Sequence, residues 1–406
     1  MRDVFGLVFP IWEEPSGCDF PSLKKTGIDT RYDHMYLGRW IRPSIAGVML
    51  CAQTITSAAA DKPQATIGAY YFDGWAGHNS LAGDLREPWA KNAPTHLTRS
   101  LTEKFAERMP IWGWRDDSLA IMEQQIDLAA DHGLAFFSFC WYWHDNQESI
   151  NRKAIQEDPK HTSMELFLKA RNNQRLKFCL MVANTGSFEI KGTENWKQAV
   201  DFWLPYLKHP QYFTVGGKPL IIIFDADGGD KAGFLYLQTA ARKAGLPGVA
   251  IAGYKYHNHC DPLPDLGYTH RTQYGLLAHK GAEAHKFAEL ADENRHLWGG
   301  GSPPQPYIPM ITAGWDKRPW EGLWGCPPLW YYPDRTPEQF MKLLRDAMAW
   351  MDQHPDQITA ERLMLIYAWN EFGEGGYIAP TRGDPNGKYL QALHAVLTAD
   401  QHHGLN

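Results

Sequence analysis

Three features are scarce or missing in this 406-residue sequence. The chain has no run of basic residues and a formal net charge of −6, which argues against a nucleic-acid partner because phosphate binding needs clustered Lys and Arg. Its six cysteines include no C-x-x-C pair, so neither a zinc ribbon nor a redox motif is supported. The apolar stretch that starts at Ile45 is too short and too broken to form a stable membrane span.

Aromatic residues, by contrast, are abundant: the chain has 17 Trp, 18 Tyr and 18 Phe. Hydrophobic residues make up 44% of the sequence, so a large core is available. Trp is costly to bury completely, and many aromatics suggest a surface that stacks against flat apolar faces. Sugar rings present such faces, and a polysaccharide or glycan is therefore the expected partner.

The first sixty residues are typical of a targeting segment. Residues 1–34 resemble neither a signal nor a domain, and a later start of translation would leave them unmade. Residues 35–60 have a positive start, an apolar centre and a small-residue end, so we expect export to the periplasm or the medium after cleavage near Ala60. A lipoprotein signal at Cys51 is the disfavoured alternative, because Leu50 is bulky where a small residue is needed.

From residue 61 onward, short β-rich runs alternate with amphipathic helices. Most runs are continuously apolar, as expected of parallel strands covered on both faces. Roughly eight strands alternating with helices predict an α/β fold, a (β/α)8 TIM barrel, as one domain over residues 61–406. A doubly wound open sheet is the alternative, but the Gly-rich phosphate turn expected after its first strand is missing. The expected strands are 66–72, 135–143, 177–184, 219–225, 249–256, 268–275, 307–315 and 363–370.

Two of the expected helices carry boundary signals. Asp116 or Asp117 is expected to cap a helix whose inner face begins with Leu119. Thr336 and Gln339 form a capping-box start for a second helix. The sequence therefore predicts where both helices begin.

Two connections are unusually long, at residues 73–116 and 257–306. Long loops in a compact domain tend to be functional. Each follows an expected strand, so we assign both to the C-terminal rim of the barrel, where active sites of this fold lie.

The last expected strand, "LMLIYAWN", is followed by two glutamates, Glu371 and Glu374. Two neighbouring carboxylates repel, so one is expected to have a raised pKa and to hold a proton while the other stays ionised. Such a pair suits cleavage of a glycosidic bond. Solvated loop glutamates, or a cap on the next helix, are the alternative interpretation.

This stretch resembles a known family. "AWNEFGEGGYIAP" followed by "GKYLQAL" is similar to the C-terminal signature of the WbsX-like group, relatives of glycoside hydrolase family 99. The resemblance extends from about residue 66 and includes "QQIDLAADHGLAFFSFCWYW", "MVAN", "YLKHPQYFTVGGKPLIIIF" and "GWDKRP". Together these motifs are specific, whereas any one alone is not.

The resemblance implies a (β/α)8 barrel and a retaining endo-α-mannosidase or endo-α-mannanase. It implies that Glu371 assists the sugar 2-hydroxyl, which attacks the anomeric carbon, and that Glu374 is general acid and then general base. The family motif usually has Trp, His and Thr where this chain has Phe372, Gly373 and Gly376. These departures keep the two glutamates aligned but put the mannose preference in doubt.

Other side chains at expected strand ends are candidates for substrate binding. Aromatics there can stack on sugars, although core packing is an equal alternative. A polar residue at such a position favours a ligand hydrogen bond, and an Asp–Arg pair can grip hydroxyls or serve only as a structural ion pair. The candidates are Tyr70, Tyr71, Trp141, Trp143, Asn184, Trp315, Asp316, Arg318, Trp369 and Asn370.

A rival function rests on Asp225 and Asp227, because metal-dependent glycosyltransferases use Asp-x-Asp to hold a cation against a nucleotide diphosphate. A turn before a helix is the plainer interpretation. His257, His259 and Asp261 resemble a metal cluster, but loop histidines are usually solvated or structural.

The sequence therefore predicts an exported glycoside hydrolase that uses no metal or cofactor and cleaves within a polysaccharide or glycan, with retention. A non-catalytic carbohydrate-binding barrel is a second alternative.

Overall fold

The computed structural model describes residues 64–77, 93–144, 152–255, 262–275, 281–299, 305–323 and 326–403. The expected signal segment lies outside these ranges, as do Cys51 and the cluster of His257, His259 and Asp261. No helix within the ranges is both long and apolar enough to cross a bilayer.

Eight parallel strands form the barrel, in the order β7-β6-β5-β3-β2-β1-β9-β8. The seam between β7 and β8 carries a parallel bridge from Arg271 to Tyr307, where the Ile308 N–H donates to the Arg271 carbonyl at 2.8 Å. The predicted (β/α)8 barrel is confirmed. The parallel strands are β1 (Thr66–Tyr71), β2 (Phe136–Trp141), β3 (Lys177–Val182), β5 (Lys218–Ile223), β6 (Ala250–Gly253), β7 (His270–Arg271), β8 (Met310–Thr312) and β9 (Leu363–Tyr367), and the short β4 (Thr214–Val215) pairs antiparallel with β5.

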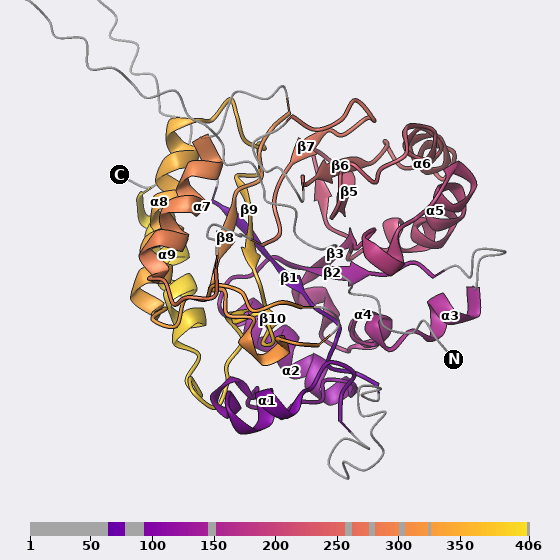
Figure 1. Cartoon of the computed structure of the whole chain (residues 1–406). Coiled ribbons are helices and arrows are strands. Elements are labelled where there is room, and N and C mark those ends of the chain that lie inside the picture. The colour runs from indigo at the N-terminus through magenta and orange to yellow at the C-terminus, as the bar shows by residue number, and fades with distance from the viewer. Residues whose placement is uncertain are drawn as a thin grey trace, which may run out of the picture. The chain divides into compact units, whose positions relative to one another are not determined.

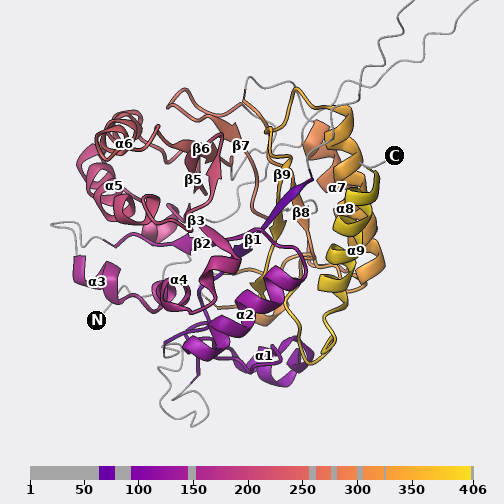
Figure 2. The same cartoon turned by 180° about the vertical axis from the view of Figure 1, so that it is seen from behind.

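The helices lie outside the strands, with α5 and α6 on one side and α7, α8 and α9 on the other (Figures 1 and 2). Helix α2 packs against α4, and α8 packs against α9. The helices are α1 (Arg99–Glu103), α2 (Leu119–Asp131), α3 (Arg152–Glu157), α4 (Thr162–Lys169), α5 (Thr193–Leu207), α6 (Lys231–Lys243), α7 (Phe287–Gly299), α8 (Pro337–Gln353) and α9 (Lys388–His403).

The capping predictions had different outcomes. The capping box of Thr336 and Gln339 is present at the start of α8. Helix α2 is capped by Ser118, whose hydroxyl accepts from the Ile121 N–H, so the prediction of Asp116 or Asp117 was wrong. Leu119 is 39% exposed rather than part of the inner face. A serine at this position gives the same capping hydrogen bond as an aspartate, which frees Asp116 for a different contact.

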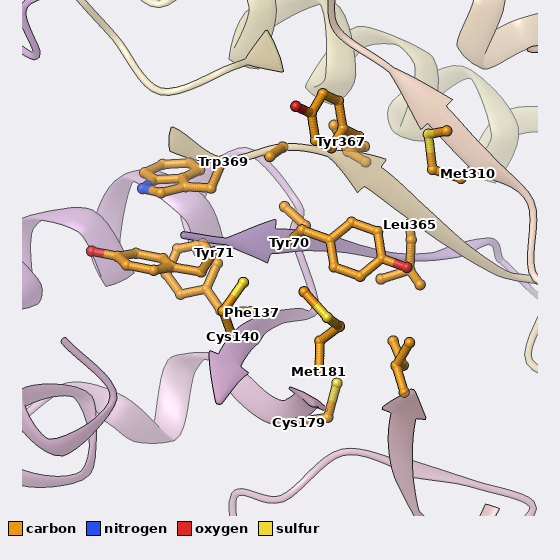
Figure 3. Close-up of a cluster of buried hydrophobic side chains, with 14 of the residues drawn as sticks. Tyr70, Tyr71, Phe137, Cys140, Cys179, Met181, Met310, Leu365, Tyr367 and Trp369 are labelled. Atoms are coloured by element: carbon orange, nitrogen blue, oxygen red, sulfur yellow. The ribbon is translucent and has the colours of Figure 1, made fainter. Parts of the chain in front are cut away.

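Alternation along the strands decides which side chains enter the barrel. Tyr70 and Tyr71 point to opposite sides of β1, and Trp369 lies on the same side as Tyr71 (Figure 3). The Trp369 Nε1 donates to Gln125 of α2 at 2.7 Å, so this side faces the helices. The continuously apolar strand sequences thus supply two core layers, one inside the barrel and one beneath the helices.

The two long connections are not equivalent. The first, between β1 and α2, contains α1 and a 3-10 helix at Ala106–Arg108. The second is not one loop, because β7 and α7 divide it; β7 lies within the strand expected at 268–275. The strand itself is short and offers only two paired residues.

Candidate active site

One cavity opens at the C-terminal ends of the barrel strands. Its empty volume, which includes the open mouth, is about 870 Å³, within the range usual for ligand sites. Aromatic side chains dominate its wall, and both glutamates line it. The described lining residues that carry the argument are Phe72, Tyr142, Phe188, Tyr254, Tyr274, Trp315, Lys317, Trp320, Glu371 and Glu374.

A tight hairpin after β9 carries the two glutamates. Its strands are β10 (Asn370–Glu371) and β11 (Gly376–Tyr377), paired antiparallel. Gly375 has φ +73°, which favours glycine, and a Cβ on Gly373 would lie 2.0 Å from the Trp320 ring. The glycines that follow the glutamates therefore permit both the turn and its close packing.

Glu371 is a buried carboxyl group that forms no ion pair with any cationic side chain of the described residues. It is 3% exposed; its Oε1 accepts a hydrogen bond from the Tyr274 hydroxyl, and its Oε2 has no partner among the described protein atoms. Burial and the nearby Glu374 charge raise the pKa of Glu371 well above its usual value, while the Tyr274 bond and Lys317 oppose the shift. Glu371 is therefore suited to hold a proton near neutral pH.

Glu374 has a different environment. Its Oε1 lies 2.9 Å from the Lys317 Nζ, and its Oε2 accepts a hydrogen bond from the Tyr367 hydroxyl. Its main-chain carbonyl accepts from the Asp316 N–H at 2.6 Å, which ties the hairpin to the segment after β8. The two carboxyl groups thus share a cavity but have unlike partners, as expected of an acid and carboxylate pair.

The tyrosines that contact the pair remain donors. Burial raises the pKa of Tyr274 and of Tyr367 well above 10, and the neighbouring carboxyl groups raise both further. Their rings pack edge to face with centres 5.0 Å apart, so the donors of the two glutamates contact each other.

Of the six aromatics predicted from strand ends, Trp315 lines the cavity and the other five do not. Tyr70 donates to the Gln273 carbonyl at 2.6 Å, and Tyr71 donates to Asp116 at 3.0 Å. Trp141 and Trp143 are 1% exposed and pack with their rings 6.2 Å apart. The structure places these four in the core, the alternative that the sequence left open.

The predicted polar residues mostly satisfy backbone groups. Asn184 exchanges two hydrogen bonds with the backbone of Asp225, each 3.0 Å. Asn370 does the same with the backbone of Phe72 at 2.7 and 2.8 Å. The two asparagines thus join neighbouring strand ends, whereas Trp369 is fully buried against α2. None of the three is among the cavity lining residues.

Asp316 and Arg318 belong to an ion cluster in which Asp316 and Arg108 are buried and Arg318 is half-buried. The Asp316 carboxylate accepts from Arg108 at 2.5 Å and from Arg318 at 2.7 Å. Arg108 also donates to the carbonyls of Asp316 and Phe372. Neither Asp316 nor Arg318 lines the cavity, so the structural ion pair is the role that their contacts support.

The Asp-x-Asp motif lies in a turn before α6. The Asp227 N–H donates to the Asp225 side chain at 3.1 Å, and the Asp227 carboxylate lies 2.8 Å from the Lys255 Nζ. Neither aspartate is among the cavity lining residues. Within the described ranges, no group of three His, Cys, Asp or Glu residues is arranged to hold a metal ion.

Sequence reasoning missed several cavity residues. Lys317 lies between Asp316 and Arg318 in the motif "GWDKRP". The two flanking residues were predicted to bind substrate, and Lys317 was not. Tyr274 lies at the end of the weakest predicted strand. Tyr367, which contacts Glu374 without lining the cavity, ends β9. Their positions at strand ends were the available signal.

An eight-stranded barrel with two carboxyl groups at its mouth has the fold of the TIM-barrel glycoside hydrolases. A family 99 endo-α-mannosidase from Bacteroides thetaiotaomicron is similar in structure, with a TM-score of 0.54 and 14% identity over 84% of this chain and 98% of that chain. A glycoside hydrolase-like protein has a TM-score of 0.56 and 13% identity over 83% of this chain and 95% of that chain. At such identities these similarities establish the fold.

The family follows from sequence. The profile described as "Glycosyltransferase WbsX" matches residues 114–393, so the chain belongs to the WbsX glycosyltransferase family. The uncharacterized protein WxcX of Xanthomonas campestris pv. campestris is 23% identical over 298 residues, which cover 64% of this chain. This chain spans only 39% of the length of that relative. The resemblance to the WbsX-like group is confirmed.

Proposed function

We propose that the protein is a glycoside hydrolase that cleaves a polysaccharide or glycan. The observation that carries this proposal is the pair of buried glutamates with unlike partners in one aromatic-lined cavity. A proton donor and a carboxylate in the same site are what glycosidic bond cleavage requires. The wall of aromatic rings supports binding of sugar faces.

The finer mechanism follows the family resemblance. Glu371 assists the sugar 2-hydroxyl as it attacks the anomeric carbon, and Glu374 protonates the leaving oxygen and later activates water. The net result is hydrolysis with retention, within the glycan chain. This assignment needs one proton on the pair before cleavage, located on Glu374.

The family description gives the second candidate, a glycosyltransferase. A metal-dependent transfer through Asp225 and Asp227 draws little support from their positions, because a backbone N–H and Lys255 engage them outside the cavity lining. Calorimetry with nucleotide sugars, with and without Mn²⁺, separates the two: metal-dependent binding favours transfer. A barrel that binds carbohydrate without cleaving it is the third possibility, and an assay for cleavage distinguishes it.

Export remains part of the proposal. The motif at residues 35–60 supports cleavage near Ala60 and an extracytoplasmic substrate. Sequencing the N-terminus of the protein recovered from its native host tests this directly. An N-terminus upstream of residue 35 contradicts it.

The decisive experiment is a screen of the purified protein against a glycan and polysaccharide panel, read by mass spectrometry. On a substrate found in this way, Glu374→Gln and Glu371→Gln should each reduce kcat by about 10²–10⁴-fold while retaining sugar binding. Glu157→Gln is a matched control, because Glu157 is exposed in α3 and far from the cavity lining. Full turnover by E374Q refutes its role as the acid.

A further inference from the structure

Lys317 is a buried cation in the cavity wall that the proposed mechanism does not use. Its side chain is 3% exposed, and its Nζ lies 2.9 Å from the Glu374 Oε1. The same Nζ lies 5.7 Å from the Trp315 ring centre and 5.9 Å from that of Trp320. Lysine is rarely buried to this extent unless it is paired. The charge of Lys317 is therefore tied to its partner, Glu374.

The contact of Lys317 is asymmetric across the glutamate pair. Glu374 forms an ion pair with the ammonium group, whereas Glu371 accepts a hydrogen bond from the neutral Tyr274 hydroxyl. A buried carboxylate is costly unless a cation or several donors compensate it. Lys317 therefore places its positive charge directly against Glu374 and not against Glu371.

The other groups that face Glu374 do not supply this charge. Tyr367 comes from β9 and donates a neutral hydrogen bond. Glu371 comes from β10 and Tyr274 from the segment after β7, and both interact electrostatically with Glu374. Cys326 interacts electrostatically with both Lys317 and Glu374. Of these described neighbours, Lys317 carries the positive charge.

We propose that Lys317 is a positioning residue that keeps Glu374 as the carboxylate and leaves the single proton of the pair on Glu371 while no substrate is bound. The inference rests on the proposed function for its meaning in catalysis. A reaction in which Glu374 is the acid then requires one prior step. The proton moves from the Glu371 carboxylic acid to the Glu374 carboxylate, and Glu371 becomes the base for the 2-hydroxyl. No other bond forms or breaks.

This step needs the ammonium group to release Glu374. A sugar that inserts a hydroxyl between the Lys317 Nζ and the Glu374 Oε1 would provide a new acceptor for the lysine. Substrate binding then controls where the proton lies. In the free enzyme the proton is on Glu371, so Glu374 cannot act as the acid until a sugar is bound.

The test reads proton location without turnover. Isotope-edited infrared spectroscopy of protein labelled with ¹³C-glutamate reports a protonated carboxyl group near neutral pH. In otherwise unchanged protein, the band should disappear in Glu371→Gln and persist in Glu374→Gln. In Lys317→Met, a second protonated band, from Glu374, should appear beside that of Glu371. The further change Glu374→Gln should remove this second band.

Lys317→Arg keeps the positive charge and should reproduce the bands of the unmodified protein. Loss of the original band in E374Q instead of E371Q overturns the proposal, as does a K317M spectrum identical to that of the unmodified protein. A K317R spectrum that matches K317M also overturns it, because the charge would then be irrelevant. The E371Q and E374Q spectra test the resting proton even if K317M does not fold. Failure to find a hydrolysed glycan leaves these spectra unaffected, so the two proposals fail separately.

Discussion

The buried carboxyl group of Asp116 makes the stability of the barrel depend on pH. Asp116 is 2% exposed; its Oδ2 accepts from the Tyr71 hydroxyl, and its Oδ1 has no partner among the described protein atoms. Burial raises the pKa of Asp116 from 3.8 to about 7, and the Tyr71 hydrogen bond opposes the shift. Burial and the Asp116 charge also raise the pKa of the adjacent Asp73.

The direction of the effect follows from the raised pKa in the folded state. Below about pH 4 the carboxyl group is protonated in both states, and its contribution to stability is fully present. As pH rises from about 4 to about 7, the unfolded chain ionises while the folded one resists, and the free energy of unfolding falls. A difference of about three pKa units corresponds to about 4 kcal/mol.

Urea denaturation across this pH range measures the loss. Asp116→Asn keeps an acceptor for Tyr71 but cannot ionise, so the unmodified protein should lose about 4 kcal/mol relative to D116N between about pH 4 and about pH 7. Asp356→Asn is the control, because Asp356 is an exposed carboxylate. A difference between D116N and the unmodified protein that stays constant with pH refutes the reasoning.

Three further variants test other contacts of the structure. Tyr274→Phe removes a hydrogen bond that stabilises ionised Glu371, so the pKa of Glu371, followed by infrared titration, should rise further; a fall contradicts this. Arg108→Met leaves buried Asp316 with one arginine, and urea denaturation should show a loss of about 3–5 kcal/mol; a loss below about 1 kcal/mol indicates that the cluster is dispensable. Thr336→Ala removes the capping box of α8 and should lower the melting temperature through a loss of about 1 kcal/mol, whereas Thr336→Ser should retain most of the stability.

The barrel could be predicted because its signal is repeated. Each strand is a continuous apolar run, and the alternation with helices recurs along the chain, so errors at single residues cancel. Even the weakest run, at 268–275, became a strand, β7, which is the shortest of the barrel.

The site was harder to predict, because whether a residue lines the cavity depends on the direction in which its side chain points. Tyr70 and Tyr71 are adjacent and identical in chemistry, yet they point to opposite sides of β1 (Figure 3). Asn184 and Asn370 have the polarity of ligand residues but bind backbone groups of neighbouring segments. Glu371 and Glu374 could be predicted because two carboxylates close together follow the last strand. Lys317 is a single lysine, and its sequence gives no comparable pattern.

The ion cluster around Asp316 has a consequence for how this cavity can change. Arg108 joins the segment after β8 to the glutamate hairpin through the carbonyls of Asp316 and Phe372, and Gly373 packs directly against Trp320. These contacts connect the glutamate hairpin to the segment after β8 and leave little room there for larger side chains. A change of specificity is therefore more easily accommodated at lining residues outside this contact network, such as Tyr142 and Phe188.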